Sequence, residues 1–406
     1  RPPRSTQGVS SAASDVYKRQ GGVFSNLGMW ALIFGRLWLM HLLTESPVYL
    51  GLVTTASLAP VLIFSALGGV IADRVNRLRL VIITRMCFAV MAITTGVLIS
   101  ISWINPWQQL VLAAISGLLL AFDIPSRQAM LPKLIPRELL ANGIALYSLL
   151  FSASAIIGPS FFAPLVHFGG IDGVFYIIGG SYVFTVLVML LMDPKLHHRD
   201  NLGYGFMEGL VGGMKYIKGN DLILTLIIVA VFFGTFGMSF ETLIPTVASN
   251  LLAGGVDVYS AMLLWLGLGG LSGTAVIASF GNLKNSPIFL LISGASFGIG
   301  VFLFAQIAWF PVVAIMLWLT GGSMVIFMTV NNTLVQTLVR DEFRGRVMSI
   351  HQLSWGMTAV GGTCIGIAAD WFGTGTAISF FALIMTVSTV GLTLRKLRDL
   401  RAIDLP

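Results

Sequence analysis

Four ionisable side chains lie inside long apolar stretches of the chain, where a charge is costly and therefore informative. They are Arg36, Asp123, Glu241 and His351. A carboxylate or an imidazole at such a position can bind and release a proton, whereas a guanidinium can attract an anion. The four residues are scattered along the chain, and an enzyme active site within a membrane would need a denser polar constellation.

Arg36 and Glu241 each have two interpretations. Arg36 lies roughly four helical turns from the inner end of its stretch. It either faces a central cavity and attracts an anionic or catecholate-like solute, or it snorkels to the outer surface about two turns away. Glu241 lies four residues before Pro245. It either carries a coupling proton, with Arg36 as a potential partner, or is a carboxylate at the outer interface.

For the other two candidates, Asp123 and His351, the sequence context favours structural roles. Asp123 precedes Arg127 by four residues, a helical pairing distance, which favours a local ion pair or gate over a proton site. His351 is one turn inside its stretch and either titrates near neutral pH or, as we expect, packs between helices through a hydrogen bond. Arg85 lies near the start of another stretch, and we expect it to snorkel.

The stretches that hold these residues predict membrane-spanning helices. The hydrophobic fraction is 56% and the charged fraction 10%. Each stretch is long enough to cross roughly 30 Å of hydrocarbon as a helix. We expect spans at 22–44, 49–71, 80–102, 107–125, 139–167, 173–192, 222–247, 259–280, 287–306, 310–338, 347–369 and 373–394. The predicted class is an all-α integral membrane protein with twelve transmembrane helices.

Charge predicts the orientation of these spans. Alternate connections carry all the loop Lys and Arg residues, and the other connections carry none of them. The second set holds acids instead, namely Glu45, Asp172, Asp257 and Asp370. Because basic loops stay in the cytoplasm, we expect a multi-pass inner (plasma) membrane protein with both termini cytoplasmic. The net charge of +7 reflects this bias and predicts no nucleic-acid partner.

The sequence lacks the residues that are typical of several other classes of protein. The two cysteines, Cys87 and Cys364, both lie inside spans and predict neither a disulfide framework nor a metal site. The sequence contains no Walker loop, dinucleotide fingerprint or Cys/His cluster. We therefore expect no cofactor, no metal ion, no enzymatic activity and no ATP-driven pumping by this chain alone.

The chain also repeats itself at an offset of 204 residues, which pairs Gly69 with Gly273 and Gly158 with Gly362. Such a parallel repeat predicts two six-helix bundles. We expect a non-native or disordered leader at 1–20, bundles at 21–192 and 221–396, a cytoplasmic linker at 193–220 and a tail at 397–406. Within the linker, 203–218 predicts an amphipathic helix on the inner membrane surface.

A loop between the second and third spans carries the strongest motif. It reads Gly69-Val-Ile-Ala-Asp73-Arg74-Val-Asn76-Arg77-Leu-Arg79 and resembles the signature loop of the major facilitator superfamily, Gly-x-x-x-Asp-basic-x-Gly-basic-basic. The glycine allows close helix approach, and the aspartate can face the positive N-terminus of a neighbouring helix. Asn76 replaces the family's glycine, and we expect it in a left-handed turn. The predicted conformational-switch residues are Gly69, Asp73, Arg74, Arg77 and Arg79.

Further stretches resemble one branch of that superfamily, the one that contains the enterobactin exporter and many predicted drug exporters. One begins Phe122-Asp123-Ile-Pro125, and another contains Arg344-Gly345-Arg346 in the tenth connection. Gly158-Pro159 resembles the core of the exporters' antiporter motif. Its alternative is a plain kink whose freed backbone groups are satisfied by neighbouring helices.

The resemblance implies secondary active transport by alternating access. It implies proton-coupled export of a small amphipathic solute, a drug-like compound or a siderophore, by a monomer. Two alternatives stay open, a facilitator that imports a nutrient or metabolite and a membrane protein without transport activity.

Overall fold

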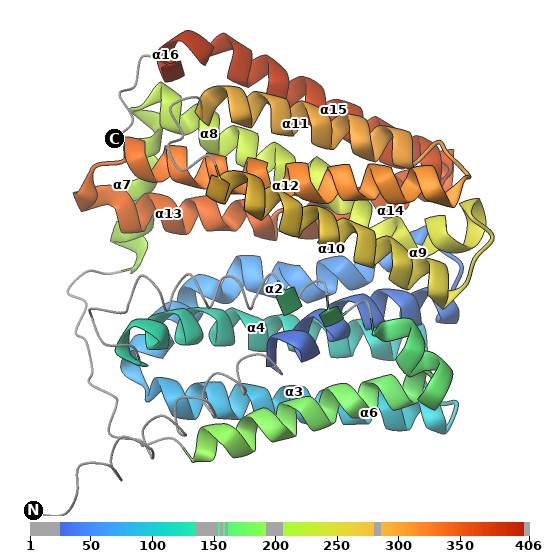
Figure 1. Ribbon diagram of the computed structural model, residues 1–406. Helices are drawn as coiled ribbons and strands as arrows, with labels where there is room; N and C mark the ends of the chain where they lie inside the picture. Colours follow the sequence, from blue (N-terminus) through green and yellow to red (C-terminus); the bar gives the residue numbers. More distant parts are fainter. Residues whose placement is uncertain are drawn as a thin grey trace, which may run out of the picture. The chain divides into compact units, whose positions relative to one another are not determined.

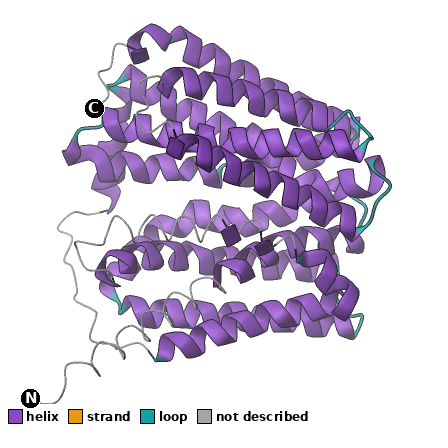
Figure 2. Ribbon diagram, viewed as in Figure 1, coloured by secondary structure: helices purple, strands orange, loops and turns teal. Residues whose placement is uncertain are grey.

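The computed structural model describes residues 25–134, 153–154, 157–158, 161–191, 206–279 and 286–401 of the chain (Figure 1). Regular structure within these ranges is helical throughout, without a strand (Figure 2). The all-α class is therefore confirmed. The expected leader at 1–20 lies outside the described residues, and of the expected tail the short helix α16 (Leu397–Arg401) is described.

Ten helical segments in the described ranges are long and apolar enough to cross a membrane. They are Ser25–Leu43, α2 (Pro47–Arg74), α3 (Arg77–Ser100), α4 (Pro106–Leu134), α6 (Phe162–Leu190), the run Asp221–Leu251, α10 (Val256–Ser279), α11 (Ser286–Phe304), α12 (Phe310–Leu338) and α15 (Thr374–Arg395). The span predicted at 310–338 coincides with α12. Most of the fifth predicted span, 139–167, lies outside the described residues.

The eleventh predicted span is two helices and not one. α13 (Asp341–Gly356) and α14 (Thr358–Phe372) meet at Met357. α13 starts before residue 347 because its first turn carries acids, which complement the positive N-terminal end of a helix. α14 ends before Gly373, whose φ of 84° suits glycine.

α6 joins the end of the fifth predicted span to the sixth. The backbone is not helical at Gly170, where φ is 70° and ψ is 174°. This kink falls between the predicted spans 139–167 and 173–192. A side chain at Gly170 would also collide with the Asp172 carboxylate, so this connection needs glycine for two reasons.

The chain forms two compact units. Unit 1 comprises residues 1–36 and 63–202, and unit 2 comprises residues 37–62 and 203–406. In unit 1, α3 packs against α6 and α4; in unit 2, α12 packs against α10 and α11 (Figure 1). Residues 37–62 group with the second half of the chain, unlike the predicted division at 21–192 and 221–396. The six-plus-six division stays a prediction.

Small residues allow the closest helix contact in unit 2, that between α10 and α12. A Cβ at Gly269 would overlap the carbonyl group of Trp318, and one at Gly273 would overlap that of Gly322. Helices in a membrane gain from such close packing because lipid supplies no hydrophobic driving force between them.

The linker helix is confirmed as α7 (Phe206–Lys218). Its Ile217 is buried, and Tyr216 stacks on Phe343 of α13 with ring centroids 4.4 Å apart. Val211 and Met214 remain exposed. A location on the inner membrane surface stays a prediction.

Candidate functional site

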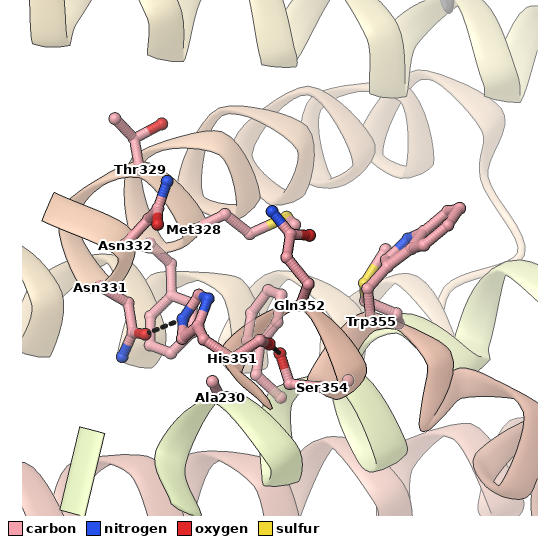
Figure 3. Close-up of a pocket in the computed structure, with 13 residues that line it drawn as sticks. Ala230, Met328, Thr329, Asn331, Asn332, His351, Gln352, Ser354 and Trp355 are labelled. Carbon is pink, nitrogen blue, oxygen red and sulfur yellow. Dashed lines mark hydrogen bonds between the residues drawn. The ribbon is translucent and has the colours of Figure 1, made fainter. Parts of the chain in front are cut away.

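His351 packs between helices of unit 2 through a hydrogen bond, as expected. Its Nε2 lies 2.7 Å from Asn331 Oδ1 on α12, and Asn331 Nδ2 donates to the Leu226 carbonyl oxygen at 3.2 Å. His351 also lines a pocket of about 220 Å³ between α12, α13 and the run that starts at Asp221 (Figure 3). Six polar side chains line this pocket: Thr329, Asn331, Asn332, His351, Gln352 and Ser354. The pocket was not predicted from the sequence.

Glu241 lies on an irregular membrane segment. The run begins as α8 (Asp221–Phe232) and continues as a π-helical turn (Phe233–Gly237), the 3-10 segment η4 (Met238–Leu243), α9 (Ile244–Thr246) and a second π-helical turn (Val247–Leu251). Such π turns within helices are frequent at functional sites. The sequence predicted a single span here and gave no sign of the irregularity except Pro245.

The Glu241 side chain is partly exposed between buried neighbours, Phe240 and Thr242. Its carboxylate makes no hydrogen bond or ion pair with any residue in the described ranges. Arg36 belongs to unit 1 and Glu241 to unit 2, so a pairing between them stays a prediction.

The first π turn packs directly on the break between α13 and α14. A Cβ at Gly234 would overlap the Ser354 carbonyl group, and one at Gly361 would overlap that of Thr235. Thr358 Oγ1 donates to the Gly234 carbonyl oxygen at 3.0 Å. Two interrupted helices therefore meet backbone to backbone, about two turns before Glu241.

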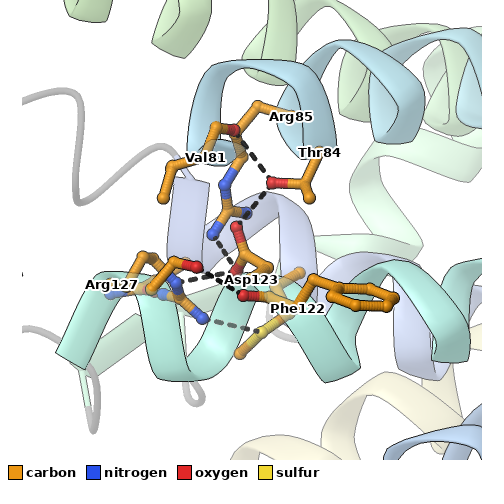
Figure 4. Close-up of polar contacts among 9 residues, drawn as sticks. Val81, Thr84, Arg85, Phe122, Asp123 and Arg127 are labelled. Carbon is orange, nitrogen blue, oxygen red and sulfur yellow. Dashed lines mark hydrogen bonds and ion pairs between the residues drawn. The ribbon is translucent and has the colours of Figure 1, made fainter. Parts of the chain in front are cut away.

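A buried ionic cluster joins α3 and α4 in unit 1 (Figure 4). Asp123 Oδ2 lies 2.7 Å from Arg85 Nη2 and 2.8 Å from Arg127 Nε. Thr84 Oγ1 donates to Asp123 Oδ1 at 3.0 Å. Arg85 and Asp123 are both 0% exposed. One buried carboxylate thus contacts two guanidinium groups, and that of Arg85 is also fully buried.

The predicted pair of Asp123 with Arg127 is confirmed, and the snorkelling predicted for Arg85 is wrong. Arg85 stays inside because a carboxylate on the neighbouring helix lies within reach. Two aromatic rings also cover its guanidinium, with Phe88 at 5.8 Å and Tyr182 at 5.5 Å from the ring centroids. Helical spacing indicated the pair within α4 but not the partner on α3.

Arg36 is buried in unit 1, with 4% of the residue exposed. Its Nη2 donates to Ser116 Oγ on α4 at 2.5 Å. Its Nε has no hydrogen-bond partner, and no carboxylate in the described ranges pairs with it. This burial contradicts the snorkelling alternative. A buried guanidinium without a counter-charge is costly, which makes Arg36 a candidate anion-binding group.

The switch loop is only partly described. α2 extends to Arg74 and so contains Gly69 and Asp73, whose side chains lie outside the described set. Asn76 is not in a left-handed turn, because its φ is −67° and its ψ 110°. It caps α3 instead, accepting a hydrogen bond from the Arg79 backbone N–H at 3.1 Å. Arg77 is buried, whereas Arg79 is exposed.

The remaining predicted motif residues have local contacts. Gly158 lies against the helix Ser25–Leu43, since a Cβ there would be 3.3 Å from the Leu27 carbonyl oxygen. Pro159 lies outside the described residues. Arg344 pairs with Asp341 at 2.5 Å. The Arg346 guanidinium lies 5.6 Å from the Phe343 ring centroid, and Gly345 has open space around it.

Residues 37–62 are held within unit 2 by polar and aromatic contacts. Trp38 stacks on Tyr259 with ring centroids 5.0 Å apart, and His41 Nε2 lies 2.8 Å from Ser249 Oγ. On the next helix, α2, Thr55 Oγ1 lies 2.5 Å from Thr363 Oγ1 of α14. These contacts were not predicted from the sequence.

The described ranges contain no group of three or more His, Cys, Asp or Glu side chains that could hold a metal ion. Both cysteines are free thiols. The candidate site therefore consists of Arg36 with the ionic cluster in unit 1, and Glu241 with the His351 pocket in unit 2.

Comparison with solved structures supports the fold. A bacterial homologue of the human lysosomal transporter Spinster, in an inward-facing and unoccupied conformation, has a TM-score of 0.73 at 14% identity and covers 97% of this chain and 99% of its own. A D-xylose–proton symporter has a TM-score of 0.72 at 12% identity, with 93% and 96% covered.

Sequence comparison supports the family. The staphyloferrin A transporter of Staphylococcus aureus (strain NCTC 8325 / PS 47) is 27% identical, with 91% of each chain covered. The multidrug efflux pump Tap of Mycolicibacterium fortuitum is 23% identical, again with 91% of each covered. Macrolide efflux protein A of Streptococcus pyogenes is 23% identical, with 76% of this chain and 77% of the relative covered.

The family model described as transmembrane secretion effector matches residues 20–406. The chain belongs to this family of the major facilitator superfamily, whose members are multi-pass membrane transporters of small molecules.

Proposed function

We propose that this protein exports a small amphipathic solute, such as a drug-like compound or a siderophore, in exchange for protons by alternating access. The relatives include a siderophore transporter and efflux pumps. The observation that carries the proposal is the Glu241 carboxylate, which has no ion pair in the described ranges and lies on a membrane segment whose helical hydrogen bonding is interrupted on both sides.

Glu241 is the proposed coupling group. A coupling group must bind a proton in one conformation and release it in the other, so a permanent ion pair would hinder it. Glu241 has no such pair in the described ranges. The π and 3-10 turns around it have weaker hydrogen-bond geometry than an α-helix, which lowers the cost of a local rearrangement.

Arg36 is the proposed contact for an anionic group of the solute. Its burial without a carboxylate partner among the described residues leaves a charge that a ligand carboxylate or catecholate would compensate. A guanidinium also offers a fork of donors that matches a carboxylate. Ser116, which already accepts from Nη2, holds the group in place.

The proposal also specifies the orientation of the protein in the membrane and one step of its transport cycle. Both termini lie in the cytoplasm, and the protein acts as a monomer without nucleic acid. The switch residues around Asp73 stabilise one closed arrangement of the inner side.

Everted membrane vesicles test the proposal. Ethidium, labelled erythromycin and labelled staphyloferrin A serve as probes, with and without an imposed proton gradient. An exporter accumulates at least one probe only when the gradient is present. A facilitator that imports its solute would only equalise the probe concentration across the membrane, with or without the proton gradient. That outcome would overturn the proposal.

The coupling role is tested by Glu241→Gln, which keeps the shape and removes the charge. We expect loss of gradient-driven accumulation while downhill exchange remains. Glu45→Gln is the matched control, because Glu45 is an exposed carboxylate in the connection before α2. If the Glu241→Gln vesicles still accumulate probe, the coupling group is another residue, and Asp123 is tested next.

A further inference from the structure

The His351 pocket of unit 2 is lined by polar but uncharged side chains together with apolar ones (Figure 3). Its volume of about 220 Å³ corresponds to roughly seven waters at about 30 Å³ each. This suits one substituted ring. Among the described residues that line it there is no Asp, Glu, Lys or Arg.

The protonation of the His351 ring follows from its neighbours. The Leu226 carbonyl oxygen can only accept, so the Asn331 amide must direct its NH₂ group there. Asn331 Oδ1 then faces His351, and Nε2 must carry the hydrogen of that 2.7 Å bond. In a neutral ring the other nitrogen, Nδ1, is an acceptor. It has no partner in the described ranges.

Other polar groups of the pocket are also available to a ligand. Asn332 Oδ1 accepts from Gln336 at 3.2 Å, which leaves its NH₂ group as a donor. The Thr329 hydroxyl and the Gln352 amide have no side-chain hydrogen bond within the part of the chain described. The pocket therefore offers donors and acceptors together, all of them neutral.

Apolar side chains complete the lining. Trp355 of α13 and Met328 of α12 are among them (Figure 3). An indole face and a thioether suit the flat or C–H face of a ring. Ten residues separate His351 from the start of α13, so the pocket lies about 15 Å along the helix from that end.

We propose that this pocket binds an uncharged, hydroxyl-bearing ring of the transported solute. This inference rests on the proposed transport function. A hydroxyl group both donates and accepts, so the hydroxyls of one ring match both the acceptor His351 Nδ1 and the donor amide of Asn332. A carboxylate or ammonium group would lose its hydration without a charged partner in return.

A binding assay without any proton gradient tests the inference. The protein is placed in lipid nanodiscs, because maltoside detergents present sugar rings that would compete. Phenyl β-D-glucoside is the neutral probe, and phenyl β-D-glucuronide carries a carboxylate in place of one hydroxymethyl group. Both probes are measured on an Arg36→Gln variant, which lacks the anion contact proposed above, and we expect the glucoside to bind at least tenfold more tightly. Equal or tighter binding of the glucuronide to this variant, or no binding of the glucoside, would overturn the proposal.

Two threonines on α12 supply a matched pair of variants. Thr329 lines the pocket, whereas Thr333 bonds the Thr329 carbonyl oxygen at 2.9 Å and does not line it. Loss of one neutral hydrogen bond weakens binding about threefold to tenfold. We expect that loss in Thr329→Val and unchanged affinity in Thr333→Val. Equal effects in the two variants would contradict a site at this pocket.

The vesicle and nanodisc assays separate the two proposals. Glucoside binding that depends on Thr329, in a protein that does not respond to a proton gradient, would refute proton-coupled export and leave the pocket assignment standing. Gradient-driven export with no glucoside binding would refute the pocket assignment and leave proton-coupled export standing.

Discussion

Asp123→Asn is expected to destabilise unit 1 more than any other single charge removal in the described cluster. The carboxylate contacts both Arg85 and Arg127, at 2.7 and 2.8 Å. An asparagine there keeps the size of the side chain but removes the negative charge that both guanidinium groups contact. Each arginine, if removed alone, would still leave the aspartate one partner.

The expected magnitude follows from the burial. Breaking a fully buried ion pair by removing one partner costs about 3–5 kcal/mol. A folding unit of 150–250 residues loses about 2–4 °C of melting temperature per kcal/mol. The melting temperature of Asp123→Asn should therefore fall by on the order of 10 °C. The value applies to Asp123 because the residue is 0% exposed, so solvent screens it little.

The assay is heating of the purified protein followed by fluorescence-detected gel filtration. Asp172→Asn is the control, because Asp172 accepts a hydrogen bond from Ser100 at 2.7 Å but has no ion pair in the described ranges. We expect a shift of about 2 °C or less in that control. A melting temperature of Asp123→Asn within about 2 °C of the native protein would refute the ionic role of the cluster.

A combined substitution extends this test. Replacing Arg85 by Met, Asp123 by Leu and Arg127 by Met removes every charge of the cluster at once. Replacement of a buried ion network by apolar side chains of similar volume is often neutral or stabilising. We expect the triple variant to recover most of the stability that Asp123→Asn loses. A triple variant less stable than Asp123→Asn would show that the cluster acts through packing and not through charge balance.

Three further predictions concern transport. Asp73→Asn should leave the protein inserted and slow transport about fivefold, since a carboxylate at a helix terminus contributes about 1 kcal/mol; unchanged transport in proteoliposomes would exclude this role. A cysteine at position 36 or 241, in a background without the native cysteines, should react with a small polar thiol reagent, and bound substrate should slow this reaction. If substrate does not change the rate of labelling, the residue does not line the substrate cavity. Thr55→Cys combined with Thr363→Cys should form a disulfide that stops transport reversibly, because the two hydroxyl oxygens are 2.5 Å apart. Transport unaffected by a formed cross-link would show that the cycle does not require this contact between α2 and α14 to open.

The existence of most membrane-spanning helices follows from the sequence, because the bilayer imposes length and composition on each segment separately. The span predicted at 310–338 matches α12, and the linker prediction at 203–218 matches α7 closely. The pairing of Asp123 with Arg127 was also predictable, since both lie on one helix at a fixed spacing. The signature loop indicated the superfamily for the same reason, as its residues are contiguous.

Contacts between helices were decided by the tertiary structure. Hydropathy placed Arg85 in a span but did not reveal that Asp123 on α4 faces it, so snorkelling was the wrong expectation. Asn76 was assigned a left-handed turn from residue preference, whereas the start of α3 uses its side chain as a cap. The break at Met357 and the π turn at Phe233–Gly237 arise where two backbones meet.

The same distinction applies to the candidate site. The sequence identified Arg36, Glu241 and His351 because charged or titratable groups in apolar runs are rare. It indicated neither the irregular segment that carries Glu241 nor the pocket beside His351. A pocket forms from side chains on three segments whose faces are set by packing, and a one-dimensional pattern contains no information on which faces meet.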